Sequence, residues 1–170
     1  MSVDYRMKII RFKNGNKEPE ILCEVEDYNK IKSMIDDLEE AYNYPDSLDK
    51  LLKKDEYFYK IITLDNIRSL IQKKKADIEK CKDKIAEIKE NLKAYYAGGK
   101  HCPEIEEDLR EELSIYEECI NPDSEEDNDI WCLRVAETVE NDIIFVSEYL
   151  KPLNYDDKEN GLYMILEGNC

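Results

Sequence analysis

The sequence has little of what usually marks an enzyme, a metal centre or a secreted protein. It contains a single histidine, His101, and its six cysteines never stand at the Cys-x2–4-Cys spacing that zinc sites use. No apolar run could span a membrane, and the N-terminus carries no apolar secretory segment. We therefore expect a non-enzymatic cytoplasmic protein with reduced thiols, no catalytic residues, no cofactor, no metal and no membrane contact.

Glycine and proline are also scarce, at five each, so long flexible linkers are not expected. Charged residues make up 39% of the chain, and Asp and Glu dominate them, which gives a formal net charge of −16. A chain this acidic is repelled by nucleic acid, so direct nucleic-acid binding is not expected. The excess of acid either serves solubility or forms a surface that meets a basic partner.

A helical repeat of apolar residues runs from Asp65 to Ala97. The gaps alternate between four and three for about four heptads, a spacing that predicts a long helix with a coiled-coil-like apolar seam. Lys74 interrupts the repeat. The seam consists of Ile67, Ile71, Ile78, Cys81, Ile85, Ile88, Leu92 and Tyr95.

A second helix is predicted directly after the first. Gly98 and Gly99 are typical of a helix end, and Pro103 favours a new helical start. Its apolar stripe continues to Ile120. A short connection makes two helices antiparallel neighbours, and the first is rich in lysine while the second is almost wholly acidic. We expect a helical hairpin in which charge selects the pairing.

Strands are expected on both sides of this hairpin. Residues 5–12 and 20–25 flank Asn14-Gly15, a strong hairpin signal, and residues 57–64 and 162–167 are rich in β-branched and aromatic side chains. Between the first strands and the third, a helix is predicted from Asp27 to Pro45. Residues 130–150 fit both alternation and a helical stripe, and their β-branched content favours a strand pair.

The predicted fold class is α+β: a small antiparallel β-sheet, a helix packed on it, and a projecting antiparallel helical hairpin. Residues 1–64 supply the β-hairpin, helix and strand, 65–120 the helical hairpin, and 121–170 an acidic loop and strands that complete the sheet. This is one domain with an inserted hairpin. Because the predicted second helix is shorter than the first, a homodimer through Ile67, Ile71 and Ile78 is an alternative way of covering the seam.

The function we expect is protein binding. Size, acidity and the lack of a catalytic signature form a profile shared with small phage-encoded inhibitors of host defence, some of which imitate nucleic acid, as anti-CRISPR proteins do. The expected partner is a basic protein surface, such as a nuclease complex that binds nucleic acid; the alternative is a scaffold that docks through its hairpin. The predicted partner-binding residues are Asp36, Asp37, Glu39, Glu40, Glu111, Glu112, Glu117, Glu118, Glu125 and Asp127.

Overall fold

The computed structural model describes residues 4–12, 19–26, 28–52, 58–99, 101–149 and 161–169. The chain forms two compact units, each described by itself below. Unit 1 comprises Met1–Ile71 and Val135–Cys170, and unit 2 comprises Gln72–Arg134. The α+β class with a small antiparallel sheet is confirmed.

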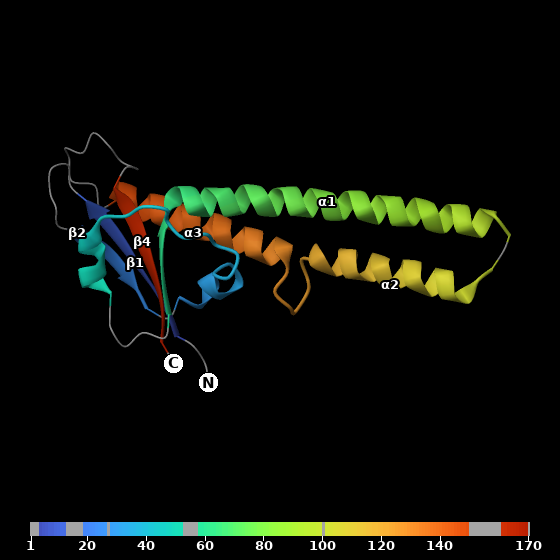
Figure 1. Ribbon diagram of the computed structural model, residues 1–170, viewed down its shortest axis with the longest axis horizontal. Coiled ribbons are helices and arrows are strands. Elements are labelled where there is room, and N and C mark those ends of the chain that lie inside the picture. The colour runs from blue at the N-terminus through green and yellow to red at the C-terminus, as the bar shows by residue number, and fades with distance from the viewer. Residues whose placement is uncertain are drawn as a thin grey trace. The chain divides into compact units, whose positions relative to one another are not determined.

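Unit 1 contains a four-stranded antiparallel sheet in the order β2-β1-β4-β3 (Figure 1). The strands are β1 (Asp4–Phe12), β2 (Pro19–Val25), β3 (Phe58–Thr63) and β4 (Leu162–Asn169). The first two form the predicted hairpin, whose Asn14-Gly15 turn lies outside the described residues. Both central strands, β1 and β4, carry runs of consecutive buried residues, so the sheet is covered on both faces.

One face of the sheet is closed by the segment around the 3₁₀ helix η2 (Asp46–Leu51). Ile10, Ile61 and Ile165 come from three neighbouring strands and pack with Leu48 as a fully buried cluster. Phe12 and Tyr163 join its border in an edge-to-face contact with ring centroids 5.7 Å apart. This apolar layer holds the sheet by burial, the main favourable term in folding.

A buried ion pair lies in the same layer. Lys8 Nζ lies 2.8 Å from Glu167 Oε1 and 3.0 Å from Oε2, and the two side chains are only 4% and 1% exposed. The ammonium also donates to the Leu51 carbonyl at 3.4 Å. These bonds satisfy both charges, which matters because an unpaired charge at this depth would be strongly destabilising.

Helix α3 (Asp129–Tyr149) belongs to unit 1 from Val135 onwards and corrects the predicted strand pair of residues 130–150. Its buried side chains recur at helical spacing: Cys132, Ala136, Val139, Ile143 and Ser147. Within unit 1 the helix is joined to β1 by a hydrogen bond from Arg11 Nη2 to the Ser147 carbonyl, at 3.3 Å. Asn128 starts the helix, since its Oδ1 accepts from the Trp131 N–H at 3.0 Å.

The predicted α-helix from Asp27 to Pro45 is also wrong. The structure has a short 3₁₀ helix, η1 (Asn29–Ser33), followed by turns. Lys60 Nζ donates to the carbonyls of Ile35 and Leu38, both at 2.7 Å, and the Ala41 N–H donates to the Ile61 carbonyl at 2.8 Å. Strand β3 and its lysine therefore take up backbone groups that an α-helix would bond internally.

Helix α1 (Leu64–Ala97) confirms the long predicted helix. The helix is capped two residues before Asp65, where the predicted repeat begins, because Thr63 and Asn66 bond reciprocally across the first turn. The Thr63 N–H donates to Asn66 Oδ1 at 2.8 Å, and the Asn66 N–H donates to Thr63 Oγ1 at 3.4 Å. The proposed dimer residues Ile67, Ile71 and Ile78 are all buried in the single chain, so they are covered without a second copy.

Helix α2 (Pro103–Cys119) confirms the second predicted helix but not its buried stripe. None of its residues is fully buried: Leu109, Leu113 and Tyr116 are half-buried, and Ile105 is 50% exposed. On α1, Ile88 is buried and Leu92 is half-buried. Coiled-coil packing of the two helices stays a prediction.

Candidate functional site

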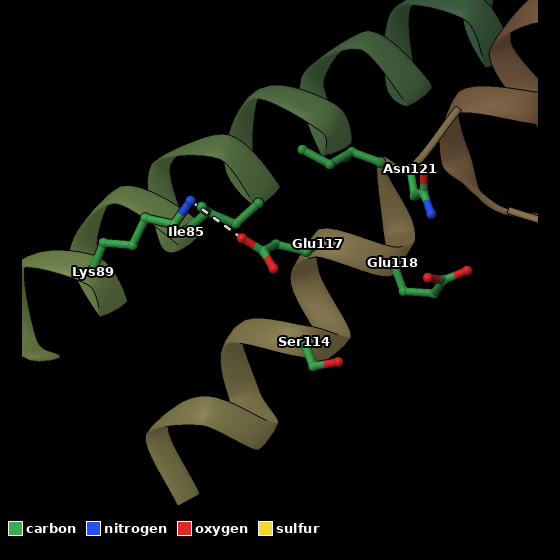
Figure 2. A pocket seen from close by; sticks show the side chains of 7 residues that line it. Ile85, Lys89, Ser114, Glu117, Glu118 and Asn121 are labelled. Atoms are coloured by element: carbon green, nitrogen blue, oxygen red, sulfur yellow. Dashed lines mark ion pairs between the residues drawn. The ribbon is translucent and has the colours of Figure 1, made fainter. Parts of the chain in front are cut away.

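Helix α2 runs beside the C-terminal half of α1 within unit 2 (Figure 1). Lys89 on α1 pairs with Glu117 on α2, with 3.2 Å between Nζ and Oε1. That pair crosses an open groove of about 490 Å³ (Figure 2). Its lining is mixed in character and contains no histidine or thiol: Ile85, Lys89, Ser114, Glu117, Glu118, Ile120 and Asn121.

Several lysines of α1 form ion pairs within α1 instead of across to α2. Lys82 and Lys84 contact Glu79 and Glu87 at 2.7 Å and 2.8 Å. Lys80 and Lys93 make the same type of contact three residues away. Lys89 and Glu117 form an ion pair between the two helices, and several other lysines of α1 bond to acids three residues away on the same helix. Charge selection of the pairing therefore stays a prediction.

The connection between α2 and α3, predicted as an acidic loop, is built around Asn128. Its Nδ2 donates to the carbonyls of Glu118 and Asn121 at 2.9 Å and 2.8 Å. The Glu118 carboxylate accepts from the Ser124 hydroxyl, and Trp131 Nε1 donates to the Ser124 carbonyl at 3.2 Å. These bonds fix the backbone from which Glu125 and Asp127 project into solvent.

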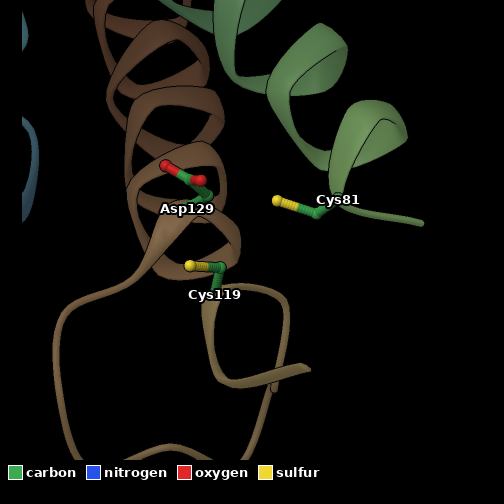
Figure 3. A group of neighbouring side chains, drawn as sticks. All are labelled: Cys81, Cys119 and Asp129. Atoms are coloured by element: carbon green, nitrogen blue, oxygen red, sulfur yellow. The ribbon is translucent and has the colours of Figure 1, made fainter. Parts of the chain in front are cut away.

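Three potential metal ligands meet in unit 2: Cys81 of α1, Cys119 at the end of α2, and Asp129 at the start of α3 (Figure 3). Burial, followed by the charges of Cys119 and Asp129, raises the pKa of the Cys81 thiol. Sequence reasoning missed this cluster because its members are far apart in the chain and no short spacing announces them. His101, the single histidine of the chain, is not among these three ligands.

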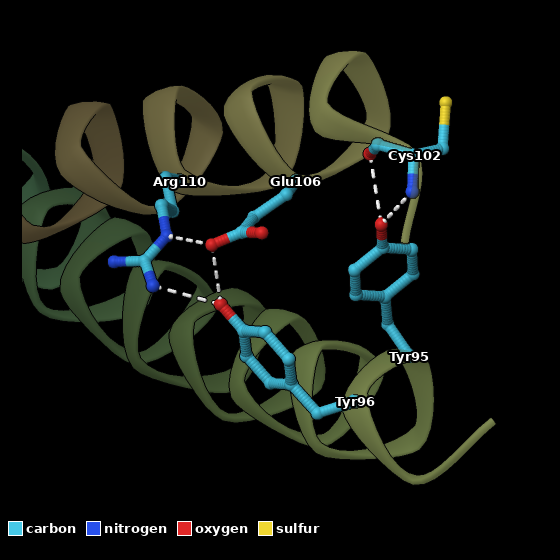
Figure 4. Close-up of polar contacts among 5 residues, drawn as sticks. All are labelled: Tyr95, Tyr96, Cys102, Glu106 and Arg110. Atoms are coloured by element: carbon cyan, nitrogen blue, oxygen red, sulfur yellow. Dashed lines mark hydrogen bonds and ion pairs between the residues drawn. The ribbon is translucent and has the colours of Figure 1, made fainter. Parts of the chain in front are cut away.

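His101 lies among aromatic rings beside the α1–α2 turn. Its ring centroid is 6.1 Å from that of Tyr95 and 6.3 Å from that of Tyr96. Tyr95 closes the turn: its hydroxyl donates to the Cys102 carbonyl at 2.8 Å and accepts from the Cys102 N–H (Figure 4). His101 itself is exposed, so its surroundings are those of a surface turn residue.

Tyr96 joins the first turns of α2 to the end of α1. Its hydroxyl donates to Glu106 Oε1 at 2.6 Å and accepts from Arg110 Nη2 at 2.7 Å, while Arg110 Nε donates to Glu106 at 3.0 Å (Figure 4). The Tyr96 hydrogen bond, and then the Arg110 bond, lower the pKa of Glu106. Glu106 and Arg110 thus have a structural role at this end of the two helices.

The predicted partner-binding residues are all exposed, and they fall into two sets. Asp36, Asp37, Glu39 and Glu40 belong to unit 1, after η1. The other six belong to unit 2: Glu111, Glu112, Glu117, Glu118, Glu125 and Asp127. The ten residues therefore do not form one patch within either unit.

A second feature of α2 was not predicted. Ile115 is 59% exposed, although it is a large apolar side chain. Residues three, four, seven and eleven positions away from Ile115 lie on the same side of the helix. Five of these residues are acidic, and all five are exposed. We call this set, with Ile115 at its centre, the acidic face of α2: Glu104, Asp108, Glu111, Glu112 and Glu118.

Comparisons with family models, curated proteins and solved structures find no match for this chain. Among the described residues, no helix is long and apolar enough to cross a membrane.

Proposed function

We propose that this protein is a non-enzymatic binding module that docks through the acidic face of α2 onto a basic surface of another protein. The observation that carries the proposal is the burial pattern of α2, in which no residue is fully buried while an exposed isoleucine is ringed by exposed carboxylates. A helix that served only to complete a core would bury a continuous stripe.

Charge supports a basic partner. The sequence from Pro103 to Asp129 has Arg110 as its single basic residue, and in the structure Arg110 bonds to Glu106 and Tyr96. Several α1 lysines bond acids of α1 itself. Apart from Glu118, which accepts from the Ser124 hydroxyl, the carboxylates of the acidic face of α2 are thereby left available to another molecule. A surface of this kind steers a basic partner and accelerates encounter, with a strong dependence on ionic strength.

Ile115 supports binding over solubility alone. Interfaces typically place an apolar anchor at the centre and polar groups at the rim. Ile115 with its surrounding carboxylates has this arrangement on one helical face. Solubility alone would need the acids but not the isoleucine.

The partner class we favour is a protein whose basic surface binds nucleic acid. Carboxylates that repeat along a helix form a line of negative charge, and such a line can occupy a channel that accepts a phosphate backbone. A phage-type inhibitor of a host nuclease complex, working in the cytoplasm by nucleic-acid mimicry, would have this character. Binding would then compete with DNA or RNA.

The test compares two charge-neutralised proteins with the wild type. The first replaces the five acids of the acidic face of α2 and the two predicted loop acids by Gln or Asn: Glu104, Asp108, Glu111, Glu112, Glu118, Glu125 and Asp127. The matched control neutralises the four acids of unit 1: Asp36, Asp37, Glu39 and Glu40. Each is used to capture partners from a host lysate at low and at high salt, and captured proteins are then titrated individually with and without competing nucleic acid.

We expect the unit 2 variant to lose affinity and most of its salt dependence, while the unit 1 control keeps both. A third protein, Ile115→Ser, should weaken binding without changing the salt slope, because it removes the apolar anchor alone. If the unit 2 variant bound with wild-type affinity and salt slope, the acidic face would serve solubility only, and the proposal would be wrong.

The second candidate function is a scaffold that self-associates or docks through apolar contacts. Two exposed isoleucines on α2 favour it, Ile105 at 50% and Ile115 at 59%. It predicts association that is insensitive to salt and is lost in an Ile105→Ser, Ile115→Ser double variant. Sedimentation across a range of protein and salt concentrations distinguishes the two candidates.

A further inference from the structure

Three segments that are distant in the sequence bring thiols and a carboxylate together in unit 2. The Sγ atoms of Cys81 and Cys119 and a carboxylate oxygen of Asp129 all lie within 4.8 Å of one another. Figure 3 shows the Cys81 side chain reaching from α1 toward the other two. Cys81 is buried, and Cys119 and Asp129 are half-buried.

We propose that Cys81, Cys119 and Asp129 bind one thiophilic divalent cation, Zn²⁺, with solvent in the fourth position. Zinc holds thiolate sulfur at about 2.3 Å and carboxylate oxygen at about 2.0–2.2 Å, so tetrahedral ligand atoms lie about 3.5–3.8 Å apart. The three ligand atoms need to move by no more than about 1 Å to reach that geometry. Two sulfurs make the set soft, which favours zinc over magnesium or calcium.

Lys74 adds a positive charge beside the three ligands. Its Nζ lies 2.7 Å from Asp129 Oδ1, and the lysine is itself buried. The bond orients the carboxylate and leaves Oδ2 for the ion, as outer hydrogen bonds do at many metal sites. Two thiolates, one carboxylate, one ammonium and one divalent cation sum to zero charge. Nearby Asp77 is offset by Lys80, 3.9 Å away.

The ion would stabilise the unit in which it lies. Its ligands come from α1, α2 and α3, and α2 has no fully buried residue to hold it in place. A metal cross-link compensates for a small core, and its binding free energy adds to the free energy of folding. The two thiol protons pass to the buffer when the ion binds, and no electron transfer is involved.

The test is a titration of the full, reduced chain with Co²⁺ under anaerobic conditions after treatment with a chelator. We expect one Co²⁺ per chain, with a near-ultraviolet thiolate-to-cobalt charge-transfer band and the visible bands of tetrahedral cobalt, both removed by Zn²⁺. Cys81→Ser and Cys119→Ser should each lose the charge-transfer intensity of one sulfur and weaken binding by more than about tenfold. Asp129→Asn should keep the charge-transfer band and bind more weakly.

The matched controls are Cys102→Ser and Cys23→Ser, which remove thiols outside the cluster and should bind Co²⁺ like the wild type. Circular dichroism of each metal-free variant checks that it is folded. A second readout is alkylation of Cys119 followed by mass spectrometry, which Zn²⁺ should slow and a chelator should restore. Failure of the wild type to bind Co²⁺, or equal binding by the cluster variants and the controls, would overturn the site.

Discussion

Strand β4 and helix α2 place their residues in contrasting environments. From Met164 to Gly168, every residue of β4 is buried, including the charged Glu167. No residue of α2 is buried, although that helix has 17 residues and the strand only 8. Burial of apolar area is the main source of stability. The comparison indicates that the sheet maintains the fold, while the side chains of α2 stay exposed, as the proposed binding role requires.

The charged groups show the same contrast. In unit 1, Lys8 and Glu167 are fully enclosed and bond to each other. In unit 2, the ion pairs of α1 and α2, such as Lys84 with Glu87, are exposed and each contributes little to stability. The buried pair of Lys8 and Glu167 is therefore structural, and most charges on α2 are free to serve a surface role.

The largest expected effect comes from breaking the buried ion pair. Glu167→Ala leaves the Lys8 ammonium without its partner inside the sheet and should lower the free energy of unfolding by about 3–5 kcal/mol. Denaturant unfolding measures the change. The control is the double variant Lys8→Met, Glu167→Met, which removes both charges and should be much less destabilising. Equal losses in the single and double variants would contradict a role for the pair.

A matched pair of truncations sharpens the comparison between sheet and helix. Ile165→Ala removes a fully buried side chain and should lower the free energy of unfolding by about 2–5 kcal/mol. Leu113→Ala removes a half-buried side chain of α2 and should cost less than about 2 kcal/mol, because less apolar area returns to water. Urea unfolding of both variants checks the order, and a reversed order would refute the comparison.

A smaller effect is expected from Tyr28 at alkaline pH. Its hydroxyl donates to Asp142 at 2.6 Å, and burial, followed by this bond, raises the pKa of Tyr28 above its usual value of 10. The unfolded state loses this proton first, so the stabilisation is complete below about pH 10 and declines as pH rises further.

The measurement is the urea midpoint of the wild type and Tyr28→Phe from neutral pH to about pH 11. The stability difference between the two should shrink or change sign at the alkaline end, because phenylalanine has no proton to lose. Tyr42→Phe, at a fully exposed side chain, is the control and should follow the wild type. Parallel curves for Tyr28→Phe and the wild type would exclude the linkage.

Local signals in the sequence predicted the strands, α1 and α2, because alternation, Asn-Gly, Gly-Gly and Pro103 act over a few residues. They failed for residues 28–45, where Lys60 and Ile61 of a distant strand take the backbone bonds. They also failed for α3, because its apolar residues fit both the alternation of a strand and the spacing of a helix. The signal that sequence reasoning missed was the helix cap at Asn128.

The candidate functional residues also divide into those that the sequence predicts and those that it does not. The exposure of individual carboxylates such as Glu111 and Glu112 follows from their type and helical position, so it was predictable. The exposure of Ile115 was not, because it depends on which side of α2 contacts α1. The cluster of Cys81, Cys119 and Asp129 was also hidden, since its members meet only when three helices are in place.

The central claim is that the sheet maintains the fold while α2 is held only by surface contacts. Native-state hydrogen exchange of the free protein, read by mass spectrometry in the presence of a chelator, tests it most directly. We predict that peptides from β1 and β4 exchange only through global unfolding, and that α2 peptides exchange through a smaller opening, at least ~100-fold faster. Equal protection of α2 and β4 would contradict the account.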